Sequence, residues 1–361
     1  MKAVVVGGGL GGLTAAIALH RTGHEVTVLE RTPQLGEIGA GLSLAPNAMR
    51  ALDALGVGER VRKYAAPSEV TGTLRTSSGR YLRRFRTGRD EPLAAFHRAQ
   101  LHGALLAELP ETVLRTGIAV TDPSEVDADV VVAADGVHSG LRRVLFPAAP
   151  TPSFRYTCWR GVVEPGAAPP MRGSFTTGRG AYFMIHPLSG DRACWALGAA
   201  ESTPGVTYPD EHAEVTRRVA GWPREARALV AATAPDAVLH NDIVDLDPLP
   251  SFTCGRVALL GDAAHAVPPD LGQGAGQAIE DAVVLAAALR DKPVADALAA
   301  YDTARRPRAA YVTKQARAKA AADTSSAWWL HFLLALTVPV LPASVIRRQT
   351  APLWDWTPPA L

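Results

Sequence analysis

A strand–helix–strand unit with a glycine-rich turn opens the chain, and it constrains the fold more than any other feature of the sequence. Two apolar runs, Ala3–Val6 and Val26–Glu30, flank helical sequence over Leu13–His20. Short continuous runs of this kind are typical of a parallel sheet that is covered on both faces. The unit therefore predicts an α/β fold with a Rossmann-like parallel sheet.

The turn between the first strand and the helix has the spacing Gly7-x-Gly9-x-x-Gly12. In such a turn Gly7 permits the tight bend, Gly9 lets a pyrophosphate approach the backbone, and Gly12 brings helix and strand together. Glu30 ends the second strand, where its carboxylate can bind an adenosine ribose, and Arg31 follows it. A turn without a ligand is the alternative, but the complete unit favours a bound dinucleotide, either NAD or FAD.

The remaining sequence indicates that this nucleotide-binding domain is discontinuous. Two further buried strands, Asp129–Ala133 and Arg256–Leu260, are separated by the alternating segments Phe154–Val163 and Ala181–Ala199, which are typical of antiparallel strands. We predict a parallel-sheet domain from 1–70, 92–150 and 251–325, a smaller α+β domain on an antiparallel sheet from 71–91 and 151–250, and a C-terminal helical, apolar cap over 326–361. The predicted helices are Glu211–Ala234, Asp281–Arg290 and Val294–Arg306.

The sequence after the last buried run distinguishes FAD from NAD. Gly261-Asp262 ends that run and leads through a proline pair into a glycine-rich segment, and a helix is expected to begin near Gly274. A carboxylate at Asp262 can bind the hydroxyls of a ribityl chain. The free N–H groups and positive end of the helix can stabilise the negative charge of a reduced flavin. These parts match bound FAD.

With these motifs the chain resembles the class A, single-component FAD-dependent aromatic hydroxylases, the p-hydroxybenzoate hydroxylase family. The shared motifs are the glycine fingerprint with Glu30, Asp135-Gly136 within AADGVHSGLRR, and Gly261-Asp262 with AAHAVPPDLGQGAG. The resemblance implies an FAD-dependent monooxygenase that uses NAD(P)H as a transient co-substrate and O2. It would hydroxylate an aromatic or polycyclic phenolic small molecule through a flavin C4a-hydroperoxide.

The resemblance also implies which residues bind FAD. They are Gly7, Gly9, Gly12, Glu30 and Arg31 at the adenosine end, Arg98 beside the pyrophosphate or ribityl chain, Asp262 on the ribityl chain, Gly41 and Ser43 near the ring and its linker, and the backbone of Gly274, Ala275 and Gly276 at the pyrimidine edge. Asp135 and Gly136 would contact a cofactor, which is either FAD or the nicotinamide cofactor. For His265 in the same motif, a buried structural role and a catalytic role are both open.

The antiparallel segment is where we look for substrate-binding residues. Tyr182, Met184 and His186 share one face of a strand, and Trp195 across the turn is a further candidate for the same pocket. Aromatic residues on such a sheet also serve as ordinary core. Our hypothesis is that Tyr182 or His186 orients a hydroxylated substrate; no catalytic residue is assigned.

Composition restricts the partners. Lys and Arg exceed Asp and Glu by 37 to 35, without a basic patch that would indicate nucleic acid. Cys158, Cys194 and Cys254 have neither disulfide nor metal-ligand spacing. We therefore expect a cytoplasmic, bacterial enzyme without a metal, whose redox chemistry comes from the cofactor.

Two segments depart from the expected pattern. The connection between Gly117 and Asp129 is shorter than is usual in the family, which implies a more exposed or more weakly bound FAD. The apolar run Ala327–Ile346 contains His331 and two prolines and is barely long enough to cross a bilayer. We expect a helix packed on the protein, with contact to a membrane surface as the alternative.

Other functions are compatible with the same cofactor domain. A flavin-dependent epoxidase, a geranylgeranyl-reductase-like enzyme acting on an apolar substrate, and a non-catalytic flavin-binding accessory protein are the alternatives. A flavin halogenase is disfavoured because its WxWxIP signature is absent. Oxygen consumption separates a monooxygenase from a reductase. The oligomeric state is not indicated by the sequence.

Overall fold

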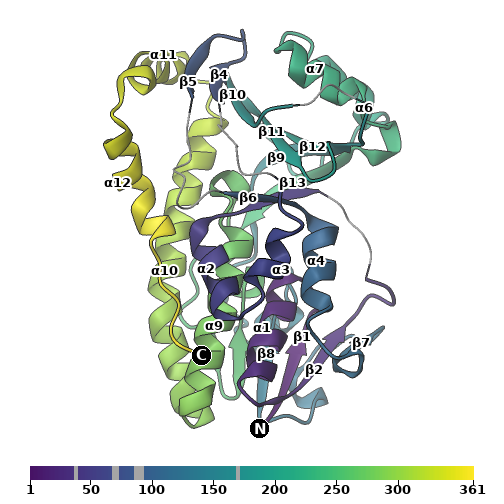
Figure 1. The fold of residues 1–361 in the computed structure, drawn as a ribbon, viewed down its shortest axis with the longest axis vertical. Helices are drawn as coiled ribbons and strands as arrows, with labels where there is room; N and C mark the ends of the chain where they lie inside the picture. Colours follow the sequence, from purple (N-terminus) through teal and green to yellow (C-terminus); the bar gives the residue numbers. More distant parts are fainter. Residues whose placement is uncertain (36–39, 67–72, 85–92, 168–170) are drawn as a thin grey trace.

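The computed structural model describes residues 1–35, 40–66, 73–84, 93–167 and 171–361, and it contains the predicted parallel sheet (Figure 1). This first sheet has the strand order β14-β15-β8-β1-β2-β7. All of its pairings are parallel except that of β14 with β15. Its strands are β1 (Lys2–Val6), β2 (Glu25–Glu30), β7 (Leu114–Thr116), β8 (Val130–Ala133), β14 (Thr253–Cys254) and β15 (Val257–Leu259).

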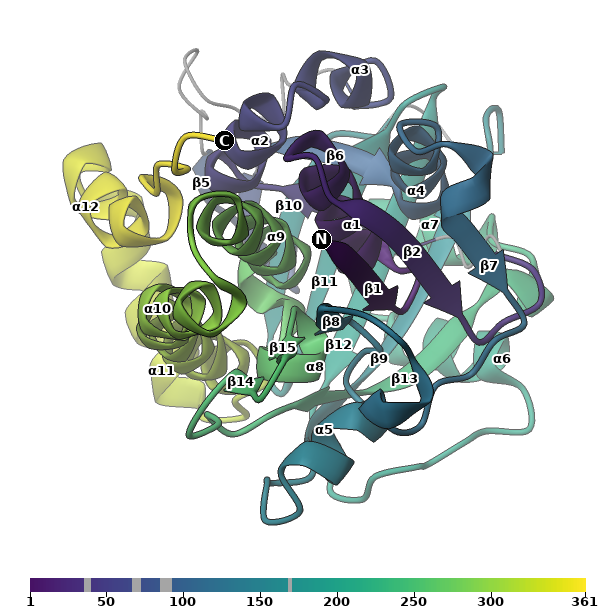
Figure 2. The same cartoon turned by 90° about the horizontal axis from the view of Figure 1, so that it is seen from below.

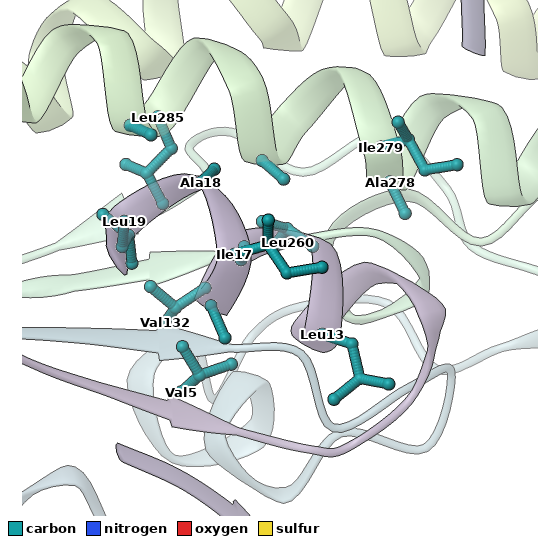
Figure 3. Packing of buried hydrophobic residues seen from close by; sticks show 14 of the residues in the cluster. Val5, Leu13, Ile17, Ala18, Leu19, Val132, Leu260, Ala278, Ile279 and Leu285 are labelled. Atoms are coloured by element: carbon teal, nitrogen blue, oxygen red, sulfur yellow. The ribbon is translucent and has the colours of Figure 1, made fainter. Parts of the chain in front are cut away.

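Helices cover this sheet and complete the main core. They are α1 (Leu10–Arg21), α2 (Pro46–Ala54), α3 (Gly58–Arg62), α4 (Arg98–Leu106), α5 (Gly140–Leu145), α8 (Asp262–His265), α9 (Gly274–Asp291) and α10 (Val294–Asp323). Figure 3 shows α1 between the sheet and α9, with Val5, Ile17 and Leu285 among the buried side chains. The continuous apolar runs of the sequence are buried here because both faces of the sheet are covered.

The second sheet is mostly antiparallel, as predicted, and has the order β13-β9-β12-β11-β10-β4-β5. Only β4 and β10 pair in parallel. Its strands are β4 (Thr73–Thr76), β5 (Tyr81–Arg84), β9 (Ser153–Val163), β10 (Ser174–Gly178), β11 (Ala181–Leu188), β12 (Arg192–Ala199) and β13 (Leu239–Asp245). Helices α6 (Glu211–Arg218) and α7 (Arg224–Ala231) pack on one face of it, and β3 (Gly41–Leu44) pairs with β6 (Ala94–His97) in a separate ribbon. Parts of the segment 71–91 lie outside the described residues.

Helix α10 is longer than the sequence predicts. The expected end at Arg306 is wrong, because Pro307 lies inside a helix that continues to Asp323. A proline in a helix interior costs about 3 kcal/mol. Arg305 and Arg308 lie on the two sides of this proline, and both bind Glu280 of α9, so α10 is held against α9 across the proline.

The chain ends in α11 (Trp328–Thr337), the short helical turn η5 (Val338–Val340) and α12 (Ala343–Trp354). Figure 2 shows these helices beside α10, on one side of the molecule. The expected packing on the protein holds for the end of the chain, where Leu353 is buried and Arg50 donates to the carbonyl of Trp356. Helix α11 packs less closely, because none of its side chains is fully buried and Leu330, His331 and Leu334 are only partly covered. In the described part of the chain, no helix is long and apolar enough to cross a membrane.

Candidate functional site

The glycines of the first turn lie at the carboxyl edge of the parallel sheet, and each has a distinct environment. Gly7 has φ +111°, and a Cβ on Gly12 would lie 1.9 Å from the Gly7 carbonyl oxygen. A Cβ on Gly9 would meet nothing within 4 Å. Gly7 and Gly12 are therefore required by the fold itself, whereas the backbone at Gly9 is open to a ligand.

The end of β2 presents a carboxylate to this turn. Glu30 accepts hydrogen bonds from the backbone N–H groups of Gly8 at 2.7 Å and Thr32 at 2.9 Å. Burial opposes ionisation of this carboxyl group, but these hydrogen bonds outweigh it and lower its pKa. The result is an anionic acceptor beside the open backbone of Gly9, while Arg31 is exposed.

A second group of candidates gathers where α9 begins. A Cβ on Gly274 would lie 4.0 Å from Oδ1 of Asp262, and the side chain of Gln273, the N-cap residue of α9, makes no capping hydrogen bond. Ser43 reaches the same loop, since its hydroxyl would lie 3.2 Å from a Cβ on Gly272. Gly272 has φ +61°, which brings the loop into the helix at this point. Uncapped N–H groups, a carboxylate and a hydroxyl thus converge, with Ala275 and Gly276 in the same helical turn.

Several predicted FAD residues also have contacts within the protein. Gly41 packs against β12, because a Cβ on it would lie 2.6 Å from Sγ of Cys194. Asp135 accepts a hydrogen bond of 2.6 Å from the hydroxyl of Ser139, the residue before α5, and so stabilises the start of this helix. Arg98 begins α4 with an exposed side chain. Gly136 has φ +83°, which permits the turn after β8.

His265 lies in a buried ionic network. Its Nε2 is 2.6 Å from Oδ2 of Asp281, and Nε of Arg305 is 2.6 Å from Oδ1 of the same carboxylate. Burial disfavours the charged imidazole, but the charge of Asp281 outweighs this and raises the pKa of His265. This is the geometry of a structural histidine that ties α8 to α9.

The face of the second sheet that carries Tyr182 reaches the loop before α9. The hydroxyls of Tyr182 and Tyr156 are 2.9 Å apart, and the Tyr156 hydroxyl donates to Asp270 at 2.8 Å. Burial raises the pKa of the Asp270 carboxyl to about 6 and keeps both phenols neutral by raising their pKa. The ring of Phe175 stacks on Tyr182 with centroids 5.1 Å apart.

Tyr156 and Asp270 are not among the residues predicted from the sequence. The alternation of Phe154–Val163 contained a signal for Tyr156, because it places this residue on one face with Cys158 and Arg160. Asp270 was visible only as one residue of the motif between Pro269 and Leu271. Its partner on β9 depends on how the two sheets meet, which periodicity does not indicate.

The other two pocket candidates are divided between the faces of the sheet. His186 lies on the same strand face as Tyr182, and burial lowers its pKa to about 4, so its imidazole is neutral. Trp195 faces the opposite way, stacks on Phe183 and donates to the Thr233 hydroxyl at 2.8 Å. The structure therefore does not bring Trp195 together with Tyr182 and His186.

A family model described as an FAD binding domain matches residues 1–116 and 107–316. The chain belongs to the FAD-dependent aromatic hydroxylases. It is accordingly an FAD-dependent monooxygenase with NAD(P)H as co-substrate, as the sequence motifs predict. The uncapped start of α9 beside Asp262, and the open backbone at Gly9 beside Glu30, are compatible with this cofactor.

Similar hydroxylases cover nearly the whole chain. The Aurachin C monooxygenase/isomerase of Stigmatella aurantiaca is 33% identical over 334 residues, 86% of either chain. The FAD-dependent urate hydroxylase of Klebsiella pneumoniae is 33% identical over 349 residues, 88% of this chain and 89% of the relative. The crystal structure of Klebsiella pneumoniae HpxO with FAD and uric acid has a TM-score of 0.88 at 28% identity, covering 97% of this chain and 95% of that one.

Proposed function

We propose that this monooxygenase hydroxylates an aromatic small molecule whose ring carries an ionisable O–H or N–H group. The observation that carries the proposal is the hydrogen-bonded series from Tyr182 through Tyr156 to Asp270, which joins the second sheet to the loop before α9. Such a series can accept a proton from the substrate. Removal of that proton increases the electron density of the ring at the carbon to be oxidised.

The direction of the hydrogen bonds supports this role. The Tyr156 hydroxyl donates its hydrogen bond to Asp270, so the Tyr156 oxygen can accept a hydrogen bond from the Tyr182 hydroxyl. The Tyr182 oxygen then retains a lone pair that can accept from a substrate O–H or N–H. Burial raises the pKa of both phenols, so neither would release its proton alone; each would accept a proton on its oxygen as it gives up its own and would be neutral before and after the transfer. The proton ends on Asp270, whose pKa of about 6 lies close to the range in which a general base is effective.

Other residues would hold the cofactor. We assign Gly9 and Glu30 to the adenosine and pyrophosphate end of FAD, Asp262 to the ribityl chain, and the start of α9 from Gly274 to the ring. Bound FAD, reduced by NAD(P)H, would supply the oxygen atom that it takes from O2. The first turn of α9 would stabilise negative charge on the ring through its free N–H groups. Ser43, beside Gly272, lies where it can contact the ring or its linker.

Names of related enzymes support the substrate class. Relatives that are 33% and 34% identical to this chain include a urate hydroxylase, a 3-amino-4-hydroxybenzoate 2-monooxygenase and a 3-hydroxybenzoate 6-hydroxylase. Each of these names contains a ring compound with an ionisable group. We further propose a cytoplasmic location, where the three free cysteines would remain reduced.

The proposal is tested with the FAD-loaded protein and a panel of hydroxylated, aminated and unsubstituted aromatic compounds. We expect NAD(P)H oxidation to be stimulated by compounds with an ionisable ring group, with one atom of 18O2 in the product. A panel in which stimulation does not depend on that group would contradict the proposed role of Asp270. Stimulated NAD(P)H oxidation that yields only hydrogen peroxide with every compound would contradict the substrate class.

A further inference from the structure

Helix α11 presents an exposed apolar face that the proposed reaction does not use. We define the apolar face as Trp328, Trp329, Phe332, Leu333, Leu336 and Val340. The exposed fractions of these side chains lie between 47% for Leu333 and 78% for Val340. We propose that this face docks on the surface of an anionic lipid bilayer, a property independent of the proposed oxidation.

The exposure follows the period of the helix. Leu330, His331 and Leu334 are only partly exposed and point to the protein, where Nε2 of His331 lies 2.8 Å from the Ser325 carbonyl oxygen. The residues on the opposite side of the helix, Trp328, Trp329, Phe332, Leu333 and Leu336, are large and apolar. A surface helix of a globular protein normally has the opposite pattern, with polar residues facing water. Contiguous apolar surface of this kind marks a site of interaction.

The charge around the apolar face indicates an anionic partner. The sequence from position 324 to 354 contains neither Asp nor Glu. Exposed arginines lie on the segments that border α11 and η5, and Arg179 donates to the Ser326 carbonyl oxygen at 3.4 Å. Arg84 is adjacent to Arg83, which donates to the Val338 carbonyl oxygen at 2.8 Å, and Arg348 follows on α12. Figure 1 shows β5 and α11 at the same end of the molecule.

A lipid surface satisfies both features, whereas a second copy of the chain does not. In a two-fold contact through α11, the arginines of both copies would border one interface, and this segment offers no acid to pair with them. Phospholipid headgroups supply the negative charge. Tryptophan and leucine side chains enter the boundary between headgroups and acyl chains, where a helix can lie parallel to the membrane. This arrangement also agrees with a helix that is too short to span a bilayer.

The test is sedimentation of the FAD-loaded full chain with vesicles. Vesicles of phosphatidylcholine alone are compared with vesicles that also contain phosphatidylglycerol. We expect binding to the second kind, weakened by salt and reduced about tenfold or more by the double substitution Trp328→Ala and Phe332→Ala. The double substitution Ile118→Ala and Val144→Ala, at exposed apolar residues elsewhere, is the matched control and should bind as the wild type does.

The charge is tested separately by Arg84→Gln combined with Arg348→Gln, which should abolish the preference for phosphatidylglycerol. The absorbance of bound FAD and the unfolding temperature confirm that each variant is folded. Absence of binding to phosphatidylglycerol vesicles would overturn the proposal, as would equal loss in the control variant. Sedimentation equilibrium without lipid is the remaining test. If the wild type is a dimer and the variant with Trp328→Ala and Phe332→Ala is a monomer, a second copy of the chain covers the apolar face and the proposal is overturned.

Discussion

The hydroxyl group of Tyr156 lies 2.8 Å from the carboxylate of Asp270, and this hydrogen bond joins the Tyr182 face of the second sheet to the loop that precedes α9. Burial raises the pKa of Asp270 to about 6, so the residue changes charge within the working range of an enzyme. The two residues come from strand β9 and from the turn η4 (Pro269–Leu271), which are far apart in the sequence. Their contact therefore connects two parts of the fold that the chain itself does not bring together.

Asp270→Asn should remove a pH dependence from the reaction. An acid with a folded-state pKa of about 6 is a carboxylate above that pH and loses its capacity to accept a proton below it. We expect the wild-type hydroxylation rate to decline as the pH falls through about 6. The variant should be slow at every pH and show no such decline, measured as the initial rate of product formation across the pH range. An unchanged pH profile in the variant would exclude Asp270 as the proton acceptor.

Tyr156→Phe and Tyr182→Phe should impair hydroxylation while FAD binding persists. Each substitution interrupts the same series of hydrogen bonds, so we expect a decrease of about 100-fold in the hydroxylation rate from either one. The double variant should be scarcely slower than either single variant, because both residues act as one unit. The measurements are the rate of product formation and the amount of product formed per NAD(P)H oxidised. If Tyr182→Phe and His186→Ala both retained normal coupling, neither residue would orient the substrate.

Gly9→Ala should weaken FAD binding without affecting the fold. A methyl group at Gly9 meets no protein atom within 4 Å, whereas the same methyl at Gly12 would lie 1.9 Å from the Gly7 carbonyl oxygen. Titration with FAD should therefore give a higher Kd for Gly9→Ala at an unchanged free energy of unfolding. Gly103→Ala, also without close neighbours, is the control and should leave the Kd unchanged. Wild-type affinity in Gly9→Ala would place the pyrophosphate elsewhere.

Arg305→Met should strongly destabilise the protein. The buried guanidinium pairs with Glu280 at 2.5 Å and Asp281 at 2.6 Å, so its removal leaves Asp281 paired only with His265 and Glu280 paired only with Arg308. Loss of one partner of such a pair costs about 3–5 kcal/mol in the free energy of unfolding. Arg306→Met, at the next and partly exposed residue, removes a surface pair with Asp302 and should cost less than about 1 kcal/mol. Urea denaturation of both variants measures the difference, and equal costs would contradict this role of Arg305.

Sequence reasoning was most successful where a feature is local. The strand–helix–strand unit was predictable because Gly7 and Gly12 are needed by the backbone geometry of the turn itself. Prediction from the sequence failed where tertiary packing determines the structure. The helix predicted to end at Arg306 continues through Pro307, where Arg305 and Arg308 on the two sides of the proline bind Glu280 of α9.

The residues of the proposed substrate site were less predictable, because their arrangement also depends on packing. Trp195 and Tyr182 lie on adjacent strands, and only the register shows that their side chains leave opposite faces of the sheet. The contact of Tyr156 with Asp270 depends on the relative placement of two sheets. The apolar run at the end of the chain predicted a helix, but its composition did not indicate which side of that helix meets the protein.

The length of α10 imposes a fixed spacing on the molecule. Near its middle Arg305 binds the carboxylates of Glu280 and Asp281 on α9, and farther along Arg317 binds Asp245 on β13. A helix advances about 1.5 Å and turns about 100° per residue. One residue inserted between Arg308 and Arg317 would therefore rotate the distal half of α10 by about 100°, and the ion pairs with α9 and with β13 could no longer form together.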